Sequence, residues 1–338
     1  MGSKQKSELR TGSIVRSRDI AELLLLAALW GGSFLFMRIA APVLGPVWLI
    51  EFRVLLAGLV LLPILAQQDL LREVRRNSIS LIVVGCINSA VPFLLLAFAS
   101  VSLPAGFTSI LNATAPLFGT IITSMWLKEK LTTARMLGFV LGFTGVVILI
   151  GWKAIATTPT LLVAVAAGLF AALMYAIAAP YIKRNLAGVS SLVVTTGSQL
   201  GAAFLLLPAL PFTIPQHTPS TTVVVAVVAL ALLSTAFAYI LYFRLIQNVG
   251  STKALTVTYL IPIFAMLWGA IILREAVNVS MILGCGLVTN RKRYRRLGPL
   301  GELAQHNETY WRLSKTLATH TVMTNEYSNQ LTTNLEPT

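Results

Sequence analysis

Residues 20–41 read IAELLLLAALWGGSFLFMRIAA, an apolar run with only two charged side chains, Glu22 and Arg38. A helix of about 20 residues crosses a hydrocarbon core about 30 Å thick, so this stretch is long enough to span a membrane. Of the 338 residues in the chain, 56% are hydrophobic and 11% charged, whereas about a quarter of the residues of a soluble domain are charged. The composition excludes a soluble or disordered chain and indicates an all-α polytopic membrane protein.

Similar apolar runs follow along the chain, separated by short polar breaks. We expect nine membrane-spanning helices, at residues 20–41, 46–66, 78–100, 104–127, 135–152, 160–182, 190–208, 221–246 and 251–273. A tenth run starts at Ala276 and ends at Val288. As a helix it would be only about 20 Å long, which is too short to cross the bilayer comfortably.

Lysine and arginine follow a pattern that predicts the orientation of the chain. They cluster in residues 1–19 and in every second connection, at 72–76, 128–135 and 183–184, whereas the other connections hold essentially Lys153 alone. Because cytoplasmic loops carry the excess of basic residues, we expect the N-terminal segment to be cytoplasmic. We expect the membrane to be a bacterial cell (inner) membrane. Topology also explains the net charge of +14, so we expect no nucleic-acid partner.

The chain contains an internal repeat at an offset of 146 residues. The matching pairs are Ser89/Thr235, Phe93/Tyr239, Pro116/Pro262, Lys128/Arg274, Glu129/Glu275 and Gly138/Gly284. Five spans separate corresponding points, and because five is odd, the two halves are expected to have opposite orientations in the membrane. Inverted repeats are typical of secondary transporters.

Several motifs together resemble the EamA-type drug/metabolite transporters. They are Leu29-Trp30-Gly31-Gly32-Ser33-Phe34 with Arg38, Arg53, Asn112-x-x-x-Pro116 with Lys128-Glu129, and Thr258-x-x-x-Pro262 with Arg274-Glu275. The resemblance implies ten helices in two inverted five-helix bundles, at residues 20–152 and 160–288. It also implies export of small metabolites and no nucleotide or metal cofactor.

The chain departs from that family in the tenth span. After Val288 the apolar run gives way to the basic stretch Arg291–Arg296 and a polar tail, which occupies residues 289–338. Either the tail is a natural extension held by a thinned or tilted tenth span, or the original reading frame has been lost, and the abrupt change of composition favours the second. We expect the tail to be largely disordered, and its basic stretch to be a stop-transfer flank rather than a lipid site.

Two prolines at corresponding positions predict where a binding site lies. Proline inside a helix frees the carbonyl four residues earlier, so Pro116 and Pro262 are expected to expose the carbonyls of Asn112 and Thr258. Such breaks at membrane depth are tolerated only against protein or a wet cavity, although a kink in a packed helix is the alternative. We expect a mostly neutral pocket formed by Trp30, Asn88, Asn112, Pro116, Tyr175, Gln199, Tyr239, Thr256, Thr258, Tyr259 and Pro262.

Pro92 predicts a third break, in the span 78–100, which would free the carbonyl of Asn88. It has no proline partner in the second half, where Ala238 stands at the corresponding position.

Three charged residues inside the spans are candidates for coupling or gating. Glu51 and Arg53 lie inside the second span and Arg38 lies near the outer end of the first, and charges within a span are functional candidates by default. Glu51 is predicted to pair with Arg38 or Arg53, and a structural ion pair or an interfacial snorkel is the alternative. Glu51 is also the acid within a span body that could carry a coupling proton.

The sequence favours a secondary transporter that exports amino acids or their derivatives by alternating access. Drugs, nucleosides and sugars are alternative substrates, and an inactive, truncated family member is a further alternative. An intramembrane enzyme would need a metal-binding or nucleophilic constellation, and the predicted spans contain no histidine. We expect a small-molecule substrate and membrane lipid as partners, possible homodimers, and neither catalytic residues nor a metal site.

Overall fold

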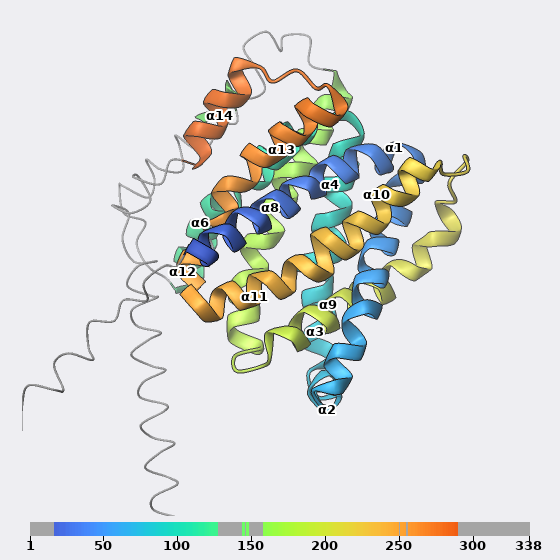
Figure 1. The fold of residues 1–338 in the computed structure, drawn as a ribbon, viewed down its shortest axis with the longest axis vertical. Helices are drawn as coiled ribbons and strands as arrows, with labels where there is room; N and C mark the ends of the chain where they lie inside the picture. The colour runs from blue at the N-terminus through green and yellow to red at the C-terminus, as the bar shows by residue number, and fades with distance from the viewer. Residues whose placement is uncertain are drawn as a thin grey trace, which may run out of the picture. The chain divides into compact units, whose positions relative to one another are not determined.

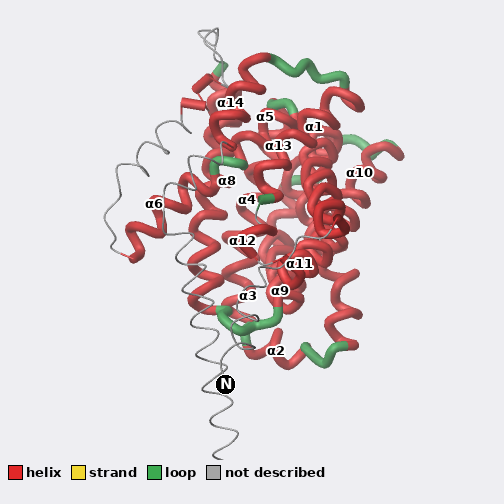
Figure 2. Tube along the Cα trace, turned by 60° about the vertical axis from the view of Figure 1, so that its left-hand side comes forward, coloured by secondary structure: helices red, strands yellow, loops and turns green. Residues whose placement is uncertain are grey.

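The structure is a computed structural model, and it describes residues 17–127, 144–145, 147–148, 158–249, 251–254 and 256–289. Every regular element in this part of the chain is a helix, as Figures 1 and 2 show. The predictions for residues 1–16, for the tail from residue 290 and for all but four residues of the span 135–152 fall outside the described residues.

The first helix, α1, runs from Ser17 to Gln67 and contains the first two predicted spans, 20–41 and 46–66. A straight helix of 51 residues would be about 75 Å long, more than twice the thickness of a hydrocarbon core. Gly45 divides it, because its backbone lies in the left-handed region (φ 74°, ψ 157°) that only glycine adopts readily. No atom lies within 4 Å of a Cβ built on Gly45, so this position requires glycine for its conformation rather than for space.

Within the described residues, five helical stretches are long and apolar enough to cross a membrane: Ser17–Gln67, Ser78–Ser102, Pro159–Asn185, Ser191–Phe212 and Thr221–Val249. The second joins α3 (Ser78–Val84), η2 (Gly85–Ala90) and α4 (Val91–Ser102), and α8 (Pro159–Asn185) is the third. The fourth joins α9 (Ser191–Leu206) and η4 (Leu207–Phe212), and the fifth joins α10 (Thr221–Ala231), η5 (Leu232–Phe237) and α11 (Ala238–Val249). A shorter apolar helix, α13, runs from Val257 to Leu273.

Large apolar side chains cover much of the outer surface of these helices. Phe204 is 64% exposed, Ile271 63% and Val225 60%. Contiguous apolar surface of this kind is unfavourable in water but is the surface that a lipid bilayer requires. The chain is therefore an integral membrane protein.

α1 lies at the centre of the helix packing. It contacts α4, α9, α10 and α13, and Figure 1 shows it in blue between the orange α13 and the yellow α10. α8 packs on α4, and the short α5 (Ala105–Asn112) packs on both α8 and α13. Helices from both halves of the sequence thus pack against α1.

Two π-helices interrupt the long helices. η2 precedes Pro92, so the break predicted from that proline takes the form of a wider helical turn. η5 lies at the equivalent place in the second half, where no proline predicts it, and its first residue, Leu232, is one position from the 146-residue offset of the repeat. π-helical turns frequently occur at functional sites.

The two prolines predicted to open symmetric breaks behave differently. Near Pro116 the chain does break, because α5 ends at Asn112 and α6 (Ala115–Leu127) starts three residues later. Pro262, by contrast, lies inside the continuous α13, and the interruption comes earlier, between α12 (Ser251–Ala254) and α13. The predicted span 104–127 is thus two short helices.

The last described helix, α14, runs from Val279 to Thr289. It follows a tight turn in which Arg274 ends α13 in the left-handed conformation (φ 55°, ψ 33°) and the Glu275 amide donates to the Gly269 carbonyl (3.1 Å). This turn places the Glu275 side chain against the start of α5, where its carboxylate accepts a hydrogen bond from the Ala105 amide (3.0 Å).

Candidate functional site

Arg53, in the second half of α1, is a cation buried among neutral side chains. Only 4% of the residue is exposed. Its Nε donates to Thr235 Oγ1 (3.0 Å), its Nη1 lies 3.9 Å from Met37 Sδ, and its Cζ lies 3.6 Å from the centroid of the Phe93 ring. The guanidinium group therefore stacks on Phe93 in a cation–π contact, which partly offsets the cost of its burial.

The π-helix η5 brings Thr235 to Arg53. The Thr235 hydroxyl donates to the carbonyl of Leu230, five residues earlier (2.9 Å), and accepts from Arg53 on its other side. The neighbouring Ser234 donates to the carbonyl of Leu29 in α1 (2.7 Å). Both hydroxyls thus tie the wide turn of the second half to the first half of the chain.

Aromatic side chains surround this arginine. Tyr175 of α8 and Tyr239 of α11 lie near the guanidinium. Tyr175 meets Phe93 edge to face (centroids 6.5 Å apart), and Trp30 meets Tyr239 in the same way (6.1 Å). The structure therefore brings together three residues of the predicted pocket, Trp30, Tyr175 and Tyr239, around Arg53.

The other predicted pocket residues lie on the surrounding elements. Asn88 is in η2, Gln199 is in α9 next to it, Asn112 and Pro116 are where α5 meets α6, and Thr256, Thr258, Tyr259 and Pro262 are at the start of α13. Their part in a single pocket stays a prediction.

Several buried polar atoms have no hydrogen bond within the described residues. They are Glu51 Oε1 and Oε2, Ser89 Oγ, Asn112 Oδ1, Thr196 Oγ1 and Gln199 Oε1, in addition to one oxygen each of Glu22 and Glu275. A buried polar atom without a partner is costly, so such atoms are concentrated where a ligand, an ion or water completes them. Glu51 stands out, since it is an ionisable, buried residue and both of its side-chain oxygens are in this set.

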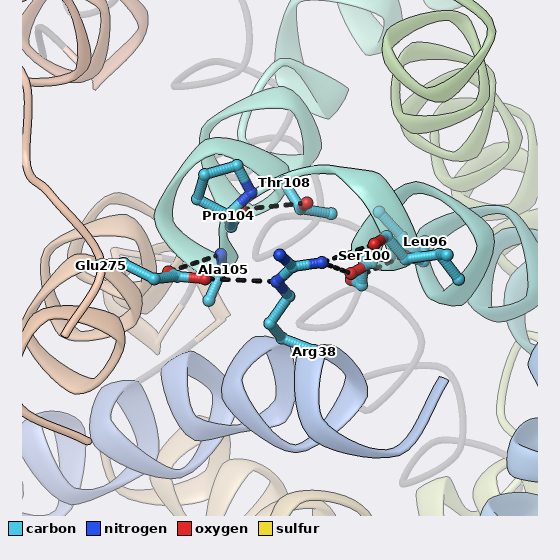
Figure 3. Close-up of polar contacts among 8 residues, drawn as sticks. Arg38, Leu96, Ser100, Pro104, Ala105, Thr108 and Glu275 are labelled. Atoms are coloured by element: carbon cyan, nitrogen blue, oxygen red, sulfur yellow. Dashed lines mark hydrogen bonds and ion pairs between the residues drawn. The ribbon is translucent and has the colours of Figure 1, made fainter. Parts of the chain in front are cut away.

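The expected pairing of Glu51 with Arg38 or Arg53 is wrong. Arg38 instead forms an ion pair with Glu275 (Nε to Oε1, 3.3 Å), as Figure 3 shows, and Arg53 points to Thr235. The reason is helical geometry, because side chains two positions apart on α1, such as Glu51 and Arg53, point to different faces.

Arg38 joins three segments at one end of the bundle. Its Nη1 donates to the carbonyls of Ser100 (3.0 Å) and Val101 (2.5 Å) at the end of α4, and its Nε faces Glu275 (Figure 3). Glu275 also caps the start of α5 through the Ala105 amide. From the sequence alone, Glu275 is one of several charged residues at the ends of spans. Its ion pair with Arg38 forms only because α1 packs against α5 and α13.

Sequence reasoning missed Met37 and Phe93 as site residues and gave Glu275 only a place at a span end. The repeat did contain a signal, because it pairs Thr235 with Ser89 and Phe93 with Tyr239. As for metals, no three His, Cys, Asp or Glu side chains lie together in the described residues as a metal site would require.

This fold, with an apolar exterior and buried polar side chains at its centre, is that of a polytopic membrane protein. The chain belongs to the EamA-like transporter family, which matches residues 20–151 and 162–289.

The chain is similar to proteins named as transporters, and the similarity covers nearly the whole length of those proteins. An uncharacterized transporter YoaV of Bacillus subtilis is 22% identical over 282 residues, which cover 81% of this chain and 97% of that protein. A probable terminal-alkyne amino-acid exporter of Streptantibioticus cattleyicolor is 25% identical over 275 residues, covering 80% and 91%. A solved crystal structure with 20% identity matches with a TM-score of 0.58 over 84% of this chain and 100% of its own, and it is similar in fold.

Proposed function

We propose that this member of the EamA-like transporter family exports small metabolites, amino acids or their derivatives first among them, by alternating access. The proposal rests mainly on the polar and aromatic centre around Arg53, which is built from α1, α4, α8, η5 and α11. One similar protein is named as an amino-acid exporter, which supports the same substrate class.

We further propose an inverted repeat of two five-helix bundles, residues 20–152 and 160–288, with the N-terminus in the cytoplasm. Two separate matches to the family and the similar positions of η2 and η5 support the repeat. Two similar halves around one central site can exchange inward-open and outward-open arrangements. In this arrangement Arg38 and Glu275 lie at the outer end of the bundle.

The test is a metabolite profile of the medium around cells that express the chain. Trp30→Ala removes an aromatic wall of the centre, and Phe204→Ala removes a ring from the exposed surface as a matched control. At equal membrane abundance, we expect a solute that the original chain and the Phe204 variant enrich in the medium and the Trp30 variant does not. Equal enrichment of the solute by the original chain and both variants would exclude this centre as the transport site.

An inactive, truncated member of the family is the second candidate, because the apolar tenth run ends at Val288. It predicts no enriched solute with any variant. Export restored by adding an apolar continuation after Val288 would then support truncation.

A further inference from the structure

Arg53 carries a positive charge that no described residue balances. Its side-chain contacts are a hydroxyl, a thioether and a phenyl ring, and no carboxylate of the described chain forms an ion pair with it. Burying a charge is costly unless it is paired and hydrogen-bonded, and a cation inside a membrane protein normally has a partner. Two other arginines of the described chain do have a carboxylate partner, because Arg38 pairs with Glu275 and Arg244 with Glu22 (3.0 Å).

One edge of the guanidinium group lacks a strong hydrogen-bond acceptor among the described residues. Nε is engaged by Thr235, and the flat face stacks on Phe93. Nη1 has only the sulfur of Met37, a weak acceptor at 3.9 Å, and Nη2 has no hydrogen bond within the described residues. Two adjacent N–H groups on one edge match the two oxygens of a carboxylate, which arginine binds in a bidentate manner.

Rings lie around the cation. Tyr175 and Tyr239 lie near it, and Trp30 packs against Tyr239. Aromatic side chains offer an apolar face for a planar or aliphatic group, and the tyrosines add a hydroxyl that can bind a polar substituent.

We propose that Arg53 binds the carboxylate group of the transported solute, and that Trp30, Tyr175 and Tyr239 hold its apolar part. The substrates are then small monocarboxylates with an aromatic or aliphatic body, a class that includes apolar amino acids. This inference rests on the proposed transport function. It favours a carboxylate over a phosphate, because one cation balances one negative charge and a phosphate monoester carries nearly two.

Matched acids and amides test the proposal. The full chain in lipid nanodiscs is titrated with L-phenylalanine and 3-phenylpropionate, with their amides, and with phenyl phosphate. We expect each acid to bind at least about tenfold more tightly than its amide, because the amide loses a charge-assisted bidentate contact. Phenyl phosphate is expected to bind more weakly than 3-phenylpropionate.

Arginine variants assign that preference to Arg53. Arg53→Gln is expected to remove the preference for acids, and Arg72→Gln, which makes the same change at an exposed residue of α2 (Leu71–Arg76), to retain it. Arg53→Lys retains the positive charge but not the two parallel N–H groups of the guanidinium, so we expect a reduced preference for acids. This variant replaces Arg53→Gln in the test if the glutamine variant does not fold.

Three results would overturn the proposal: amides that bind as well as acids, a preference for acids that persists in Arg53→Gln, or no binding of any acid in the set. Export through the Trp30-dependent site of a solute that has no carboxylate group would also overturn it while leaving the transport function in place. A preference for acids that depends on Arg53, without any export, would instead overturn the transport function alone.

Discussion

The Thr235 hydroxyl makes two hydrogen bonds at once, one as a donor and one as an acceptor. Serine has the same hydroxyl and can make both. The Thr235 hydroxyl donates to the Leu230 carbonyl and accepts from Arg53 Nε. The first bond satisfies a carbonyl of α10 just before the π-helix, and the second fixes the position of a buried cation. A single side chain therefore couples an irregular backbone to the orientation of the guanidinium group.

Thr235→Val removes both bonds at nearly unchanged volume. A hydrogen bond to a charged group contributes about 1.5–3 kcal/mol, so we expect the rate of transport to fall by roughly tenfold or more. The measurement is the initial rate of solute uptake into inverted membrane vesicles. Thr235→Ser retains the hydroxyl and is expected to restore most of the rate; a valine variant as active as the serine variant would exclude this role.

Glu51 is a candidate for coupling transport to protons. It is buried, and both of its carboxylate oxygens are without a hydrogen bond in the described part of the chain. We expect Glu51→Gln to abolish transport driven by a pH gradient and to retain exchange of labelled for unlabelled solute, because glutamine has the same shape without a titratable proton.

The control for this prediction is Glu73→Gln. Glu73 lies in the short α2, outside the spans, and accepts a hydrogen bond from the Ser190 amide (3.2 Å) that a glutamine oxygen can also accept. Both kinds of transport should survive in this variant. Gradient-driven transport that persists in Glu51→Gln would show that the coupling proton, if there is one, uses another group.

At the scale of elements, close helix contacts at glycines decide the packing around the site. A Cβ on Gly31 of α1 would lie 2.7 Å from Phe264 Cβ and 2.9 Å from the Ala265 backbone nitrogen in α13. Small residues of this kind let helix backbones approach in membranes, where packing replaces the hydrophobic effect as the driving force for helix association. Trp268 of α13 adds a hydrogen bond to the Ala28 carbonyl (3.0 Å) at the same contact.

Gly31→Ala is therefore expected to destabilise the protein, and Gly32→Ala is the matched control. Overpacking costs about 1–3 kcal/mol, and α1 and α13 must separate because the atoms in the way include backbone. A Cβ on Gly32 meets nothing closer than Phe36 at 3.6 Å, an ordinary contact. Thermal unfolding in detergent measures the difference, and equal unfolding temperatures would contradict the close contact.

At the scale of the whole molecule, Arg38 and Glu275 join the two halves of the chain. Arg38 lies in the first family match and Glu275 in the second, and their ion pair gathers α1, the end of α4, the start of α5 and the turn before α14 (Figure 3). In a transporter that works by alternating access, contacts between the halves at one end must form and break in each cycle.

A double-mutant cycle with Arg38→Gln and Glu275→Gln measures this contact. We expect a coupling energy of about 0.2–1 kcal/mol, since both side chains are partly exposed (30% and 15%). Arg38→Gln alone should be the more harmful change, because it also loses the bonds to the Ser100 and Val101 carbonyls, whereas a glutamine at 275 can still accept from Ala105. Strictly additive effects in denaturant titrations would show that the pair contributes nothing.

Much of the fold was predictable from apolar run length, because a membrane demands about 20 apolar residues per helix wherever the chain crosses it. The ends of the runs 78–100, 160–182 and 221–246 agree with the structure to within a few residues. Local chemistry also signalled the break near Pro116. The π-helix η5 was not predictable in this way, since it contains no proline and depends on the contacts of Ser234 and Thr235 with α1.

Composition and periodicity by themselves thus determined that this protein is a helical membrane protein with a repeat, and they singled out Trp30, Tyr175, Tyr239 and Arg53 as candidates. Only the tertiary structure decided the partners of the charges. Arg38 forms an ion pair with Glu275, Arg53 stacks on Phe93 beside Thr235, and Glu51 pairs with neither of these arginines. The physical reason is that burial in a membrane constrains each span separately, whereas an ion pair depends on which faces of distant helices meet.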